Sequence, residues 1–329
     1  MLSENLTPSI IVHGGVGESD DSIKMEKMNT CQKAASVGYK ILMNGGKASV
    51  AAEAALSWFE DDEFFNCGYG SVLNEIGEVE MDASMMDGSK MEIGSVAAVS
   101  DITHPITLAK YIMENYPNSI IVGEGAKKLA KFANLNSVSK GSMIAPASLC
   151  AYKSAVSGDF QVSTFDSSAV SEALKNSSDT VGCVVWDGER IIAAASTGGL
   201  NKKLVGRVGD SPLLGCGVFA NNHVGCCLTG HGESAIKAGL SRSIVNCISQ
   251  CQTLSEALQI NLDNLQKQTA HDCGGIALDK CGCWSIYFTG TTMPYAFIRN
   301  NLITYGIDRG EKITKPYRDL SKEETCYCK

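Results

Sequence analysis

The clearest candidate for a catalytic residue is Thr180, which lies where a serine-rich stretch meets an apolar segment. From 135 to 179 the chain is rich in serine and has no sustained apolar period, which predicts a mobile loop. Val181 to Trp186 is apolar and predicts a buried strand. Cleavage of the bond between Asp179 and Thr180 would give Thr180 a free α-amine beside its hydroxyl, which is a nucleophile with its own base.

Ordinary backbone is the alternative interpretation of this site, because threonine is common at the start of strands. A terminal amine nevertheless suits the role of base, since an unperturbed α-amino group titrates at about 7.7–8.0 and is partly neutral near pH 7. The uncleaved chain lacks this amine. The first cut must therefore use the Thr180 hydroxyl with local help, and strain in the Asp179–Thr180 bond is one hypothesis for its source.

Other hydrolase patterns fail in this sequence. Gly232-Glu-Ser234-Ala-Ile lacks the last glycine of a nucleophile elbow. The five histidines do not have the spacing of a metalloprotease site. A cysteine nucleophile remains an alternative among the fourteen cysteines, although none lies in a recognisable histidine-bearing signature. Thr180 is therefore the candidate with a self-contained mechanism.

The segments that must position Thr180 are strands and helices in a repeated order. Val181–Trp186 and Arg190–Ala195 flank an Asp187-Gly188 turn and predict a β-hairpin. Residues 78–83 alternate acidic and apolar side chains, which predicts a half-buried strand. Further strands are expected at 10–13, 95–99, 274–279 and 284–288, and helices at 25–43, 47–59, 105–115, 125–133, 233–250 and 253–268. This order predicts a pair of sheets covered by helices, built as one domain from both halves of the chain.

The composition is that of an ordinary globular protein, with 44% hydrophobic and 19% charged residues. The net charge of −8 gives no basic surface, so neither nucleic acid nor an anionic membrane is expected as a partner. No apolar run approaches the length of a membrane span, and the start of the chain lacks the pattern of a secretory signal. We therefore expect a cytoplasmic protein whose cysteines stay reduced. The pairs Cys281-Gly-Cys283 and Cys326-Tyr-Cys328 have spacings seen in metal ligands, but no further ligands complete a zinc site.

Several longer motifs occur in a characteristic order along nearly the whole chain. They are His13-Gly-Gly, Asn66-x-Gly-x-Gly-Ser71, Met81-Asp-Ala, Thr180-Val-Gly-Cys, Ser196-Thr-Gly-Gly, Gly206-Arg-Val-Gly-Asp-Ser-Pro, Thr229-Gly-His-Gly-Glu and Gly274-Gly. This set resembles the plant-type asparaginase and isoaspartyl peptidase family of N-terminal-nucleophile hydrolases. The resemblance implies an α+β fold, a four-layer αββα sandwich. It also implies self-cleavage into an α chain, 1–179, and a β chain, 180–329, which stay associated and assemble as a dimer of αβ heterodimers.

The resemblance also implies a role for each motif residue. Thr180 would be the nucleophile, with Thr197 hydrogen-bonded to it or its neighbours. Thr229 and Gly230 would form the oxyanion hole. The substrate-binding residues would be Asn66, Arg207, Gly209, Asp210, His231 and Gly232, with Arg207 on the substrate α-carboxylate and Asp210 on its α-amine.

Each of these roles has a physical basis and an alternative. An arginine fork matches a carboxylate, and an aspartate accepts from an ammonium group; the alternative for Arg207 and Asp210 is an exposed ion pair. Thr229-Gly230 precedes a helix, whose N–H groups and dipole favour negative charge; the alternative is a plain helix cap. The loop of Asn66 would position the site or hold a monovalent cation, as the resemblance suggests, or it is a structural turn.

The implied activity is cleavage of β-aspartyl peptides and of L-asparagine through a β-aspartyl ester on Thr180, with no metal or organic cofactor in the chemistry. The expected partner is a small molecule or a dipeptide. Asp179 departs from the glycine that usually precedes the nucleophile in asparaginases and resembles threonine aspartase and aspartylglucosaminidase instead. A site-specific protease and a glycosylasparagine amidase are therefore the enzymatic alternatives. An uncleaved interaction protein is the non-enzymatic one. The tail 311–329 has no assigned role.

Overall fold

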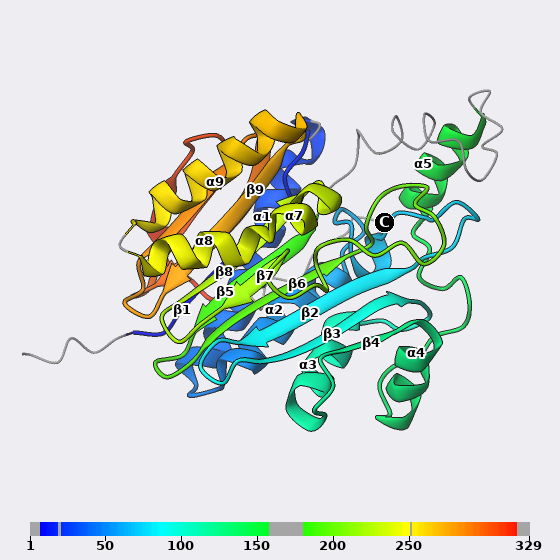
Figure 1. Ribbon diagram of the computed structural model, residues 1–329, viewed down its shortest axis with the longest axis horizontal. Helices are drawn as coiled ribbons and strands as arrows, with labels where there is room; N and C mark the ends of the chain where they lie inside the picture. Colours follow the sequence, from blue (N-terminus) through cyan, green and yellow to red (C-terminus); the bar gives the residue numbers. More distant parts are fainter. Residues whose placement is uncertain (1–6, 19–20, 158–179, 251, 321–329) are drawn as a thin grey trace, which may run out of the picture.

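The computed structural model describes residues 7–18, 21–157, 180–250 and 252–320, which form two β-sheets and a set of helices (Figure 1). The larger sheet has nine strands in the order β13-β12-β11-β1-β5-β6-β2-β3-β4. These are β1 (Ser9–His13), β2 (Met81–Asp87), β3 (Glu92–Val99), β4 (Ile120–Val122), β5 (Val181–Trp186), β6 (Ile191–Thr197), β11 (Thr292–Arg299), β12 (Leu302–Asp308) and β13 (Ile313–Pro316). The smaller sheet has the order β10-β9-β8-β7. Its strands are β7 (Val218–Ala220), β8 (Val224–Gly230), β9 (Cys273–Asp279) and β10 (Trp284–Phe288).

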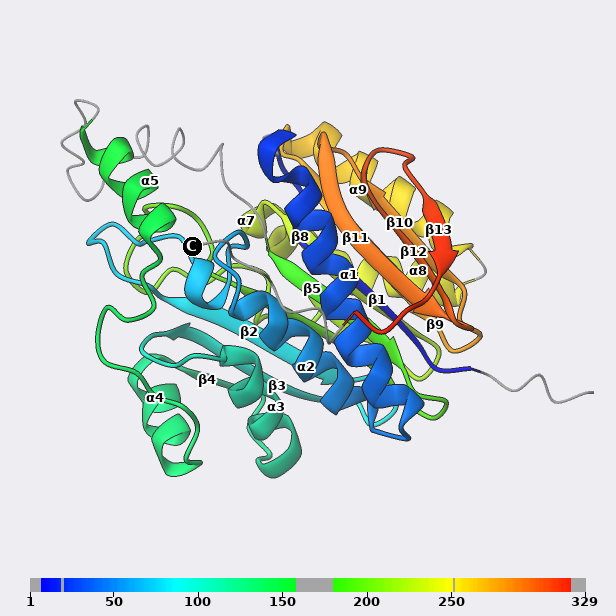
Figure 2. The ribbon, with the colours of Figure 1, turned by 180° about the vertical axis from the view of Figure 1, so that it is seen from behind.

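The helices contact the two sheets in separate groups. Along the chain they are α1 (Asp21–Met43), α2 (Ala48–Glu60), α3 (Pro105–Asn115), α4 (Gly123–Phe132), α5 (Pro146–Ser157), α7 (Gly232–Ala238), α8 (Leu240–Ser249) and α9 (Leu254–Thr269). Helices α1, α2 and α3 contact strands of the nine-stranded sheet, and α8 and α9 contact the four-stranded sheet (Figures 1 and 2). Strands β5 and β6 also contact β8 of the other sheet. The nine-stranded sheet combines strands from both halves of the chain, and the fold is mixed α+β, as expected. None of the described helices is long and apolar enough to cross a membrane.

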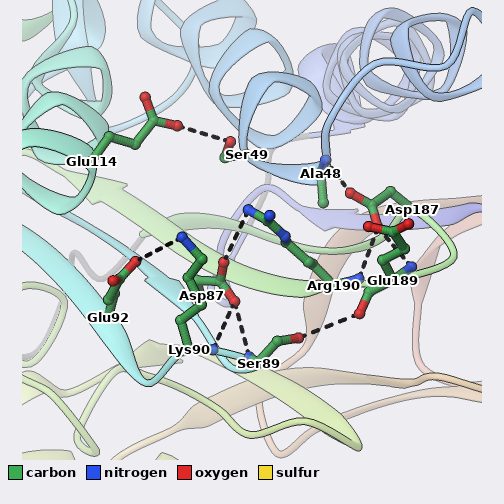
Figure 3. Close-up of polar contacts among 10 residues, drawn as sticks. All are labelled: Ala48, Ser49, Asp87, Ser89, Lys90, Glu92, Glu114, Asp187, Glu189 and Arg190. Carbon is green, nitrogen blue, oxygen red and sulfur yellow. Dashed lines mark hydrogen bonds and ion pairs between the residues drawn. The ribbon is translucent and has the colours of Figure 1, made fainter.

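The predicted hairpin is confirmed, and its turn also begins a helix. Strands β5 and β6 pair antiparallel around Asp187, whose Oδ1 accepts hydrogen bonds from the N–H groups of Glu189 (2.9 Å) and Arg190 (2.8 Å). Its Oδ2 accepts from the N–H of Ala48 at 2.8 Å, at the start of α2 (Figure 3). Lys47, at the N-cap position, makes no side-chain cap bond. Asp187 therefore supplies from a distant turn the carboxylate that a local cap would give.

The expectation of a half-buried strand at 78–83 is wrong for β2, in which every residue is buried. The strand is covered on both faces because it lies in the nine-stranded sheet, with α3 and β7 among its contacts. Asp82 is fully buried, and its carboxylate accepts from the N–H of Ala98 (2.8 Å) and of Gly209 (3.3 Å). Asp82, one of the acidic residues in the alternating pattern, is therefore a buried hydrogen-bond acceptor and does not face solvent.

Two further expectations need correction. The stretch 135–179 was expected to be a loop, yet it contains helix α5; the part 158–179, including Asp179, lies outside the described residues. The single helix expected at 233–250 is two helices, α7 and α8, because Gly239 adopts a left-handed conformation (φ 52°) between them. Strands β11, β12 and β13, which the sequence pattern did not reveal, extend the nine-stranded sheet beyond β1.

Other elements agree closely with expectation. Helix α3 has the expected bounds, with proline at its start. The capping box that opens α9 is present, since Thr253 and Glu256 exchange backbone and side-chain hydrogen bonds. Strands β9 and β10 pair across the expected turn.

Candidate active site

A small pocket lies where β6 and β8 end and β5 begins. It is lined by Thr180, Thr197, Gly199, Leu200, Arg207, Gly209, Asp210, Ser211, Gly230 and Gly232. The structure therefore brings together most of the predicted site residues from segments far apart in the chain. Asn66, Thr229 and His231 lie behind or beside this wall.

Thr180 and Thr197 lie at the same end of one strand pair. Val181 of β5 is paired with Ser196 of β6 in an antiparallel ladder. Thr180, which precedes Val181, therefore lies beside Thr197, which follows Ser196. Both threonines are almost fully buried, and the Thr197 hydroxyl oxygen accepts a hydrogen bond from the Gly199 N–H at 2.9 Å. Thr180, at the start of β5, therefore lines the same pocket as Thr197, whose hydroxyl is held by the backbone of its own loop.

Asn66 fastens that loop from behind the pocket. Its Nδ2 donates to the Gly199 carbonyl at 2.6 Å, and its backbone carbonyl accepts from the Gly198 N–H at 2.8 Å. Its Oδ1 accepts from the Val72 N–H at 3.0 Å. Asn66 therefore positions the glycine pair after Thr197, and no direct place in the pocket wall is found for it.

Thr229 ties the end of β8 to the glycine-rich loop after β1. Its hydroxyl oxygen accepts from the Val16 N–H at 3.2 Å, and only 3% of its surface is exposed. The next residue, Gly230, has φ 133°, a conformation that side chains rarely adopt. A Cβ at Gly230 would also lie 2.6 Å from the Asp272 carbonyl, so glycine is required here for two reasons.

Arg207 has an ion-pair partner that the sequence pattern did not reveal. Its Nε donates to Glu233 Oε1 and its Nη2 donates to Glu233 Oε2, both at 2.9 Å. The side chain of Arg207 is 14% exposed and that of Glu233 is 36% exposed, so the pair is partly buried. Its acceptor is Glu233 and not Asp210. Burial alone would raise the pKa of Glu233, but the hydrogen bonds and charge of Arg207 hold it below its usual value.

Three glycines lie against the guanidinium of Arg207. A Cβ at Gly209 would lie 2.9 Å from Arg207 Nη1, and one at Gly199 would lie 3.1 Å from the same atom. A Cβ at Gly232 would lie 3.0 Å from both Arg207 Nη2 and Asp210 Oδ1. Side chains at these positions would crowd the groups that face the pocket. The glycines therefore leave a cation and a carboxylate accessible in one small space.

Asp210 is a buried carboxyl group in the pocket wall. Burial raises its pKa to about 6, although a backbone hydrogen bond and the charge of Arg207 oppose the rise. Near neutral pH it is therefore ionised. A cation and an anion on one wall match the carboxylate and ammonium groups of an α-amino acid.

His231 lies beside this arrangement. Its Nδ1 is 2.7 Å from the Ser234 Oγ, its Nε2 is 3.4 Å from a Glu233 oxygen, and its ring stacks on His271 with centroids 3.8 Å apart. Burial and the charge of His271 lower the pKa of His231. A neutral imidazole here contacts the partner of Arg207 and not the pocket itself.

The loop that carries Arg207 is supported by residues that sequence analysis missed. Lys203 is 3% exposed, and its Nζ donates to the Glu80 carbonyl at 2.7 Å. Burial lowers the pKa of this lysine, an effect that Asp82 opposes. The Glu80 carboxylate accepts from the Gly206 N–H at 3.0 Å, and Asp82 accepts from the Gly209 N–H. The only signal was the acidic residues at alternate positions of 78–82.

The loop before Gly70 has a shape suited to a cation. The carbonyl oxygens of Phe65, Asp62 and Glu63 would lie 2.2, 2.8 and 2.9 Å from a Cβ at Gly70, so they converge on a space that only glycine leaves open. Converging carbonyl oxygens are the ligands of hard cations. In the described part of the chain, no group of three or more histidine, cysteine or acidic side chains could hold a metal ion.

Comparison with known proteins identifies the class. The sequence profile of the asparaginase family matches residues 6–307, nearly the whole chain, and the chain belongs to this family. It is 37% identical over 310 residues to the mouse protein named isoaspartyl peptidase/L-asparaginase, covering 93% of this chain and 92% of the mouse protein. The human protein of the same name is 36% identical over 306 residues, with 92% and 97% covered. The Xenopus laevis protein of that name is 34% identical over 313 residues, with 94% and 98% covered.

The pKa of Asp210 predicts how binding of an amino acid depends on pH. Above about 6 its carboxylate attracts an α-ammonium group, and below that pH it is protonated and the attraction is lost. We expect the Kd of L-aspartate, measured calorimetrically, to rise about tenfold per pH unit below pH 6. Asp210→Asn should bind weakly and without this dependence. A Kd that is flat from pH 5 to 7 in the unaltered protein would show that Asp210 does not contact the ammonium group.

Proposed function

We propose that this chain is a self-processing N-terminal threonine hydrolase that cleaves β-aspartyl peptides and the side-chain amide of L-asparagine. The observation that carries the proposal is the pocket in which Thr180, at the start of β5, shares one wall with Arg207 and Asp210. The names of its relatives, which cover nearly the whole chain, support the same activity. Asp179 is the feature that favours the protease or glycosylasparagine alternatives.

In the proposed reaction the substrate's α-carboxylate binds Arg207 and its α-ammonium group binds Asp210. The β-carbonyl carbon is then held near the Thr180 hydroxyl, which attacks it while the free amine of Thr180 takes the proton. Thr229 and Gly230 stabilise the negative oxygen of the tetrahedral intermediate. The Thr180 amine then gives this proton to the substrate's leaving amine, or to ammonia when the substrate is asparagine, and a β-aspartyl ester remains on Thr180. Water, activated by the Thr180 amine, hydrolyses the ester and releases aspartate.

The proposed architecture follows the family. We place the helices and the two sheets in a four-layer αββα sandwich, cleaved into 1–179 and 180–329, with two such heterodimers in the particle. The helix groups on the two sheets and the contacts between β5, β6 and β8 support the layering. The partners are small substrates, and the location is cytoplasmic. A light-scattering mass of one αβ pair, and not two, would contradict the assembly.

Cleavage is the first test of the function. Intact mass and N-terminal sequencing of purified protein should show a chain that begins Thr-Val-Gly-Cys. Thr180→Ala should remain one inactive chain, and Thr180→Ser, which keeps a hydroxyl, should retain some cleavage. The cleaved protein should hydrolyse a β-aspartyl dipeptide and L-asparagine but not glycosylated asparagine.

Each other outcome has a definite meaning. A new terminus elsewhere would refute Thr180 as the nucleophile. Preference for glycosylated asparagine would place the chain with the glycosylasparagine amidases, and cleavage of only a folded protein substrate would place it with the site-specific proteases. A chain that stays intact after long incubation would favour the non-enzymatic alternative.

The role of Arg207 can be tested with one change in the protein and one in the substrate. Lysine lacks the planar fork, so Arg207→Lys should lower kcat/KM for asparagine by about 10- to 150-fold, the value of a hydrogen bond to a charged group of roughly 1.5–3 kcal/mol. Asparagine whose α-carboxylate is replaced by an amide should lose activity with the unaltered enzyme and much less with the variant. Self-cleavage should survive, since Thr180 is unchanged. Losses that simply multiply would show that Arg207 does not contact this carboxylate.

We also propose that the carbonyls of Asp62, Glu63 and Phe65 hold a monovalent cation, with no cofactor in the chemistry itself. When bound, the cation would neutralise these dipoles and stabilise the loop of Asn66. The Tm of the protein should be higher in sodium or potassium chloride than in tetramethylammonium chloride of equal ionic strength, because the large cation does not fit the space. Equal Tm values in the three salts would count against the site.

A further inference from the structure

Cys281 and Cys283 lie in the turn between β9 and β10, and β10 is an edge strand of the four-stranded sheet. Cys281 and Cys283 are both free and exposed, with only Gly282 between them. Their backbone N–H groups donate to one oxygen of Asp279, at 2.9 Å and 2.8 Å. One carboxylate oxygen of Asp279 therefore holds the backbone of both cysteines in a tight turn at the surface.

A cation packs beneath the middle of this turn. A Cβ at Gly282 (φ 76°) would lie 2.3 Å from the Cζ of Arg299 and 2.5 Å from its Nη1. Arg299 Nε is buried, and among the described residues it has no hydrogen-bond partner. The guanidinium thus lies against the residue that separates the two sulfurs. Burial, Asp279 and the neighbouring Cys281 raise the pKa of Cys283, and the charge of Arg299 opposes this rise.

The other described cysteines differ in ways that make this pair distinct. Cys31, Cys183, Cys226 and Cys227 are fully buried, and burial raises the pKa of each, so they are unreactive core residues. Cys150, on α5, is exposed and single. Cys67 and Cys273 are buried as well, and Cys216 and Cys247 are half-buried. Among the described residues, the turn is therefore the only place where two exposed cysteines lie within two positions of each other.

We propose that Cys281 and Cys283 form a reversible thiol–disulfide exchange site for small disulfides such as glutathione disulfide. The thiolate of one cysteine attacks a sulfur of glutathione disulfide, forms a mixed disulfide and releases one glutathione as its thiolate, which takes up the proton. The second cysteine, as thiolate, attacks the protein sulfur of that mixed disulfide and releases the second glutathione. The turn is oxidised by two electrons, and one glutathione disulfide becomes two glutathione thiols.

The turn favours the second step and keeps it reversible. Because the cysteines are one residue apart, the resolving thiol is present at a high effective concentration. Gly282 gives the backbone the freedom that a small ring requires. So small a ring is strained, and strained, exposed disulfides are readily reduced. The site therefore cycles with the thiol pool and does not become a permanent crosslink.

The test uses full-length, cleaved protein in which Cys326→Ser and Cys328→Ser remove the second pair, which lies outside the described residues. After incubation with glutathione disulfide, free thiols are alkylated and peptides are analysed by mass spectrometry. The peptide with both turn cysteines should be lighter by two hydrogens, unalkylated and free of glutathione, and dithiothreitol should reverse this. Cys150, the matched single thiol, should carry glutathione instead.

Single variants separate the two steps. Cys281→Ser and Cys283→Ser should each accumulate the mixed disulfide on the remaining turn cysteine, because the resolving thiol is missing. The proposal is overturned if the unaltered turn carries two glutathiones, or if it stays fully alkylated while Cys150 reacts. A disulfide from the turn to any other cysteine would overturn it as well.

Discussion

The antiparallel pairing of β5 with β6 is the constraint on which the site depends. Every residue of both strands is buried, so each backbone polar group must find its partner in the ladder. A slip of one residue would exchange the faces of all side chains between the two cores and is strongly disfavoured. The register that places Val181 opposite Ser196 therefore also places Thr180 beside Thr197. The position of Thr180, the proposed nucleophile, therefore follows from the packing of the sheet.

Buried charge explains the rest of the site. A guanidinium or carboxylate removed from water is costly unless it is paired or hydrogen-bonded. Arg207 meets this requirement through Glu233, Asp82 through two backbone N–H groups, and Lys203 through a backbone carbonyl. These bonds fasten the long connection between β6 and β7, which has no strand ladder of its own at this point. The same interactions that satisfy buried charge thus make an irregular loop rigid enough to hold a binding group.

Local signals made much of this fold predictable from sequence. The hairpin at Asp187 and the capping box at Thr253 are short-range patterns, and both are present. The partner of Arg207 could not be found in this way, because Glu233 lies on another element and nothing local links the two. Asp82 was misassigned because alternation describes which face a residue occupies and not whether that face meets water. The division of α7 from α8 depends on the backbone conformation of Gly239, since a glycine in a helical pattern does not reveal its own φ.

The glycines of the pocket show why recognising motif residues is not the same as predicting their role. Gly209 and Gly232 have ordinary backbone conformations, so glycine is not needed there for a turn. What requires it is the guanidinium of Arg207, which would lie 2.9–3.0 Å from a Cβ at either position. The missing side chains leave the pocket wall open beside Arg207 and Asp210. In the proposed reaction, selection therefore acts on the α-carboxylate and α-ammonium groups, and the substrate's side-chain carbonyl is the part left to reach Thr180.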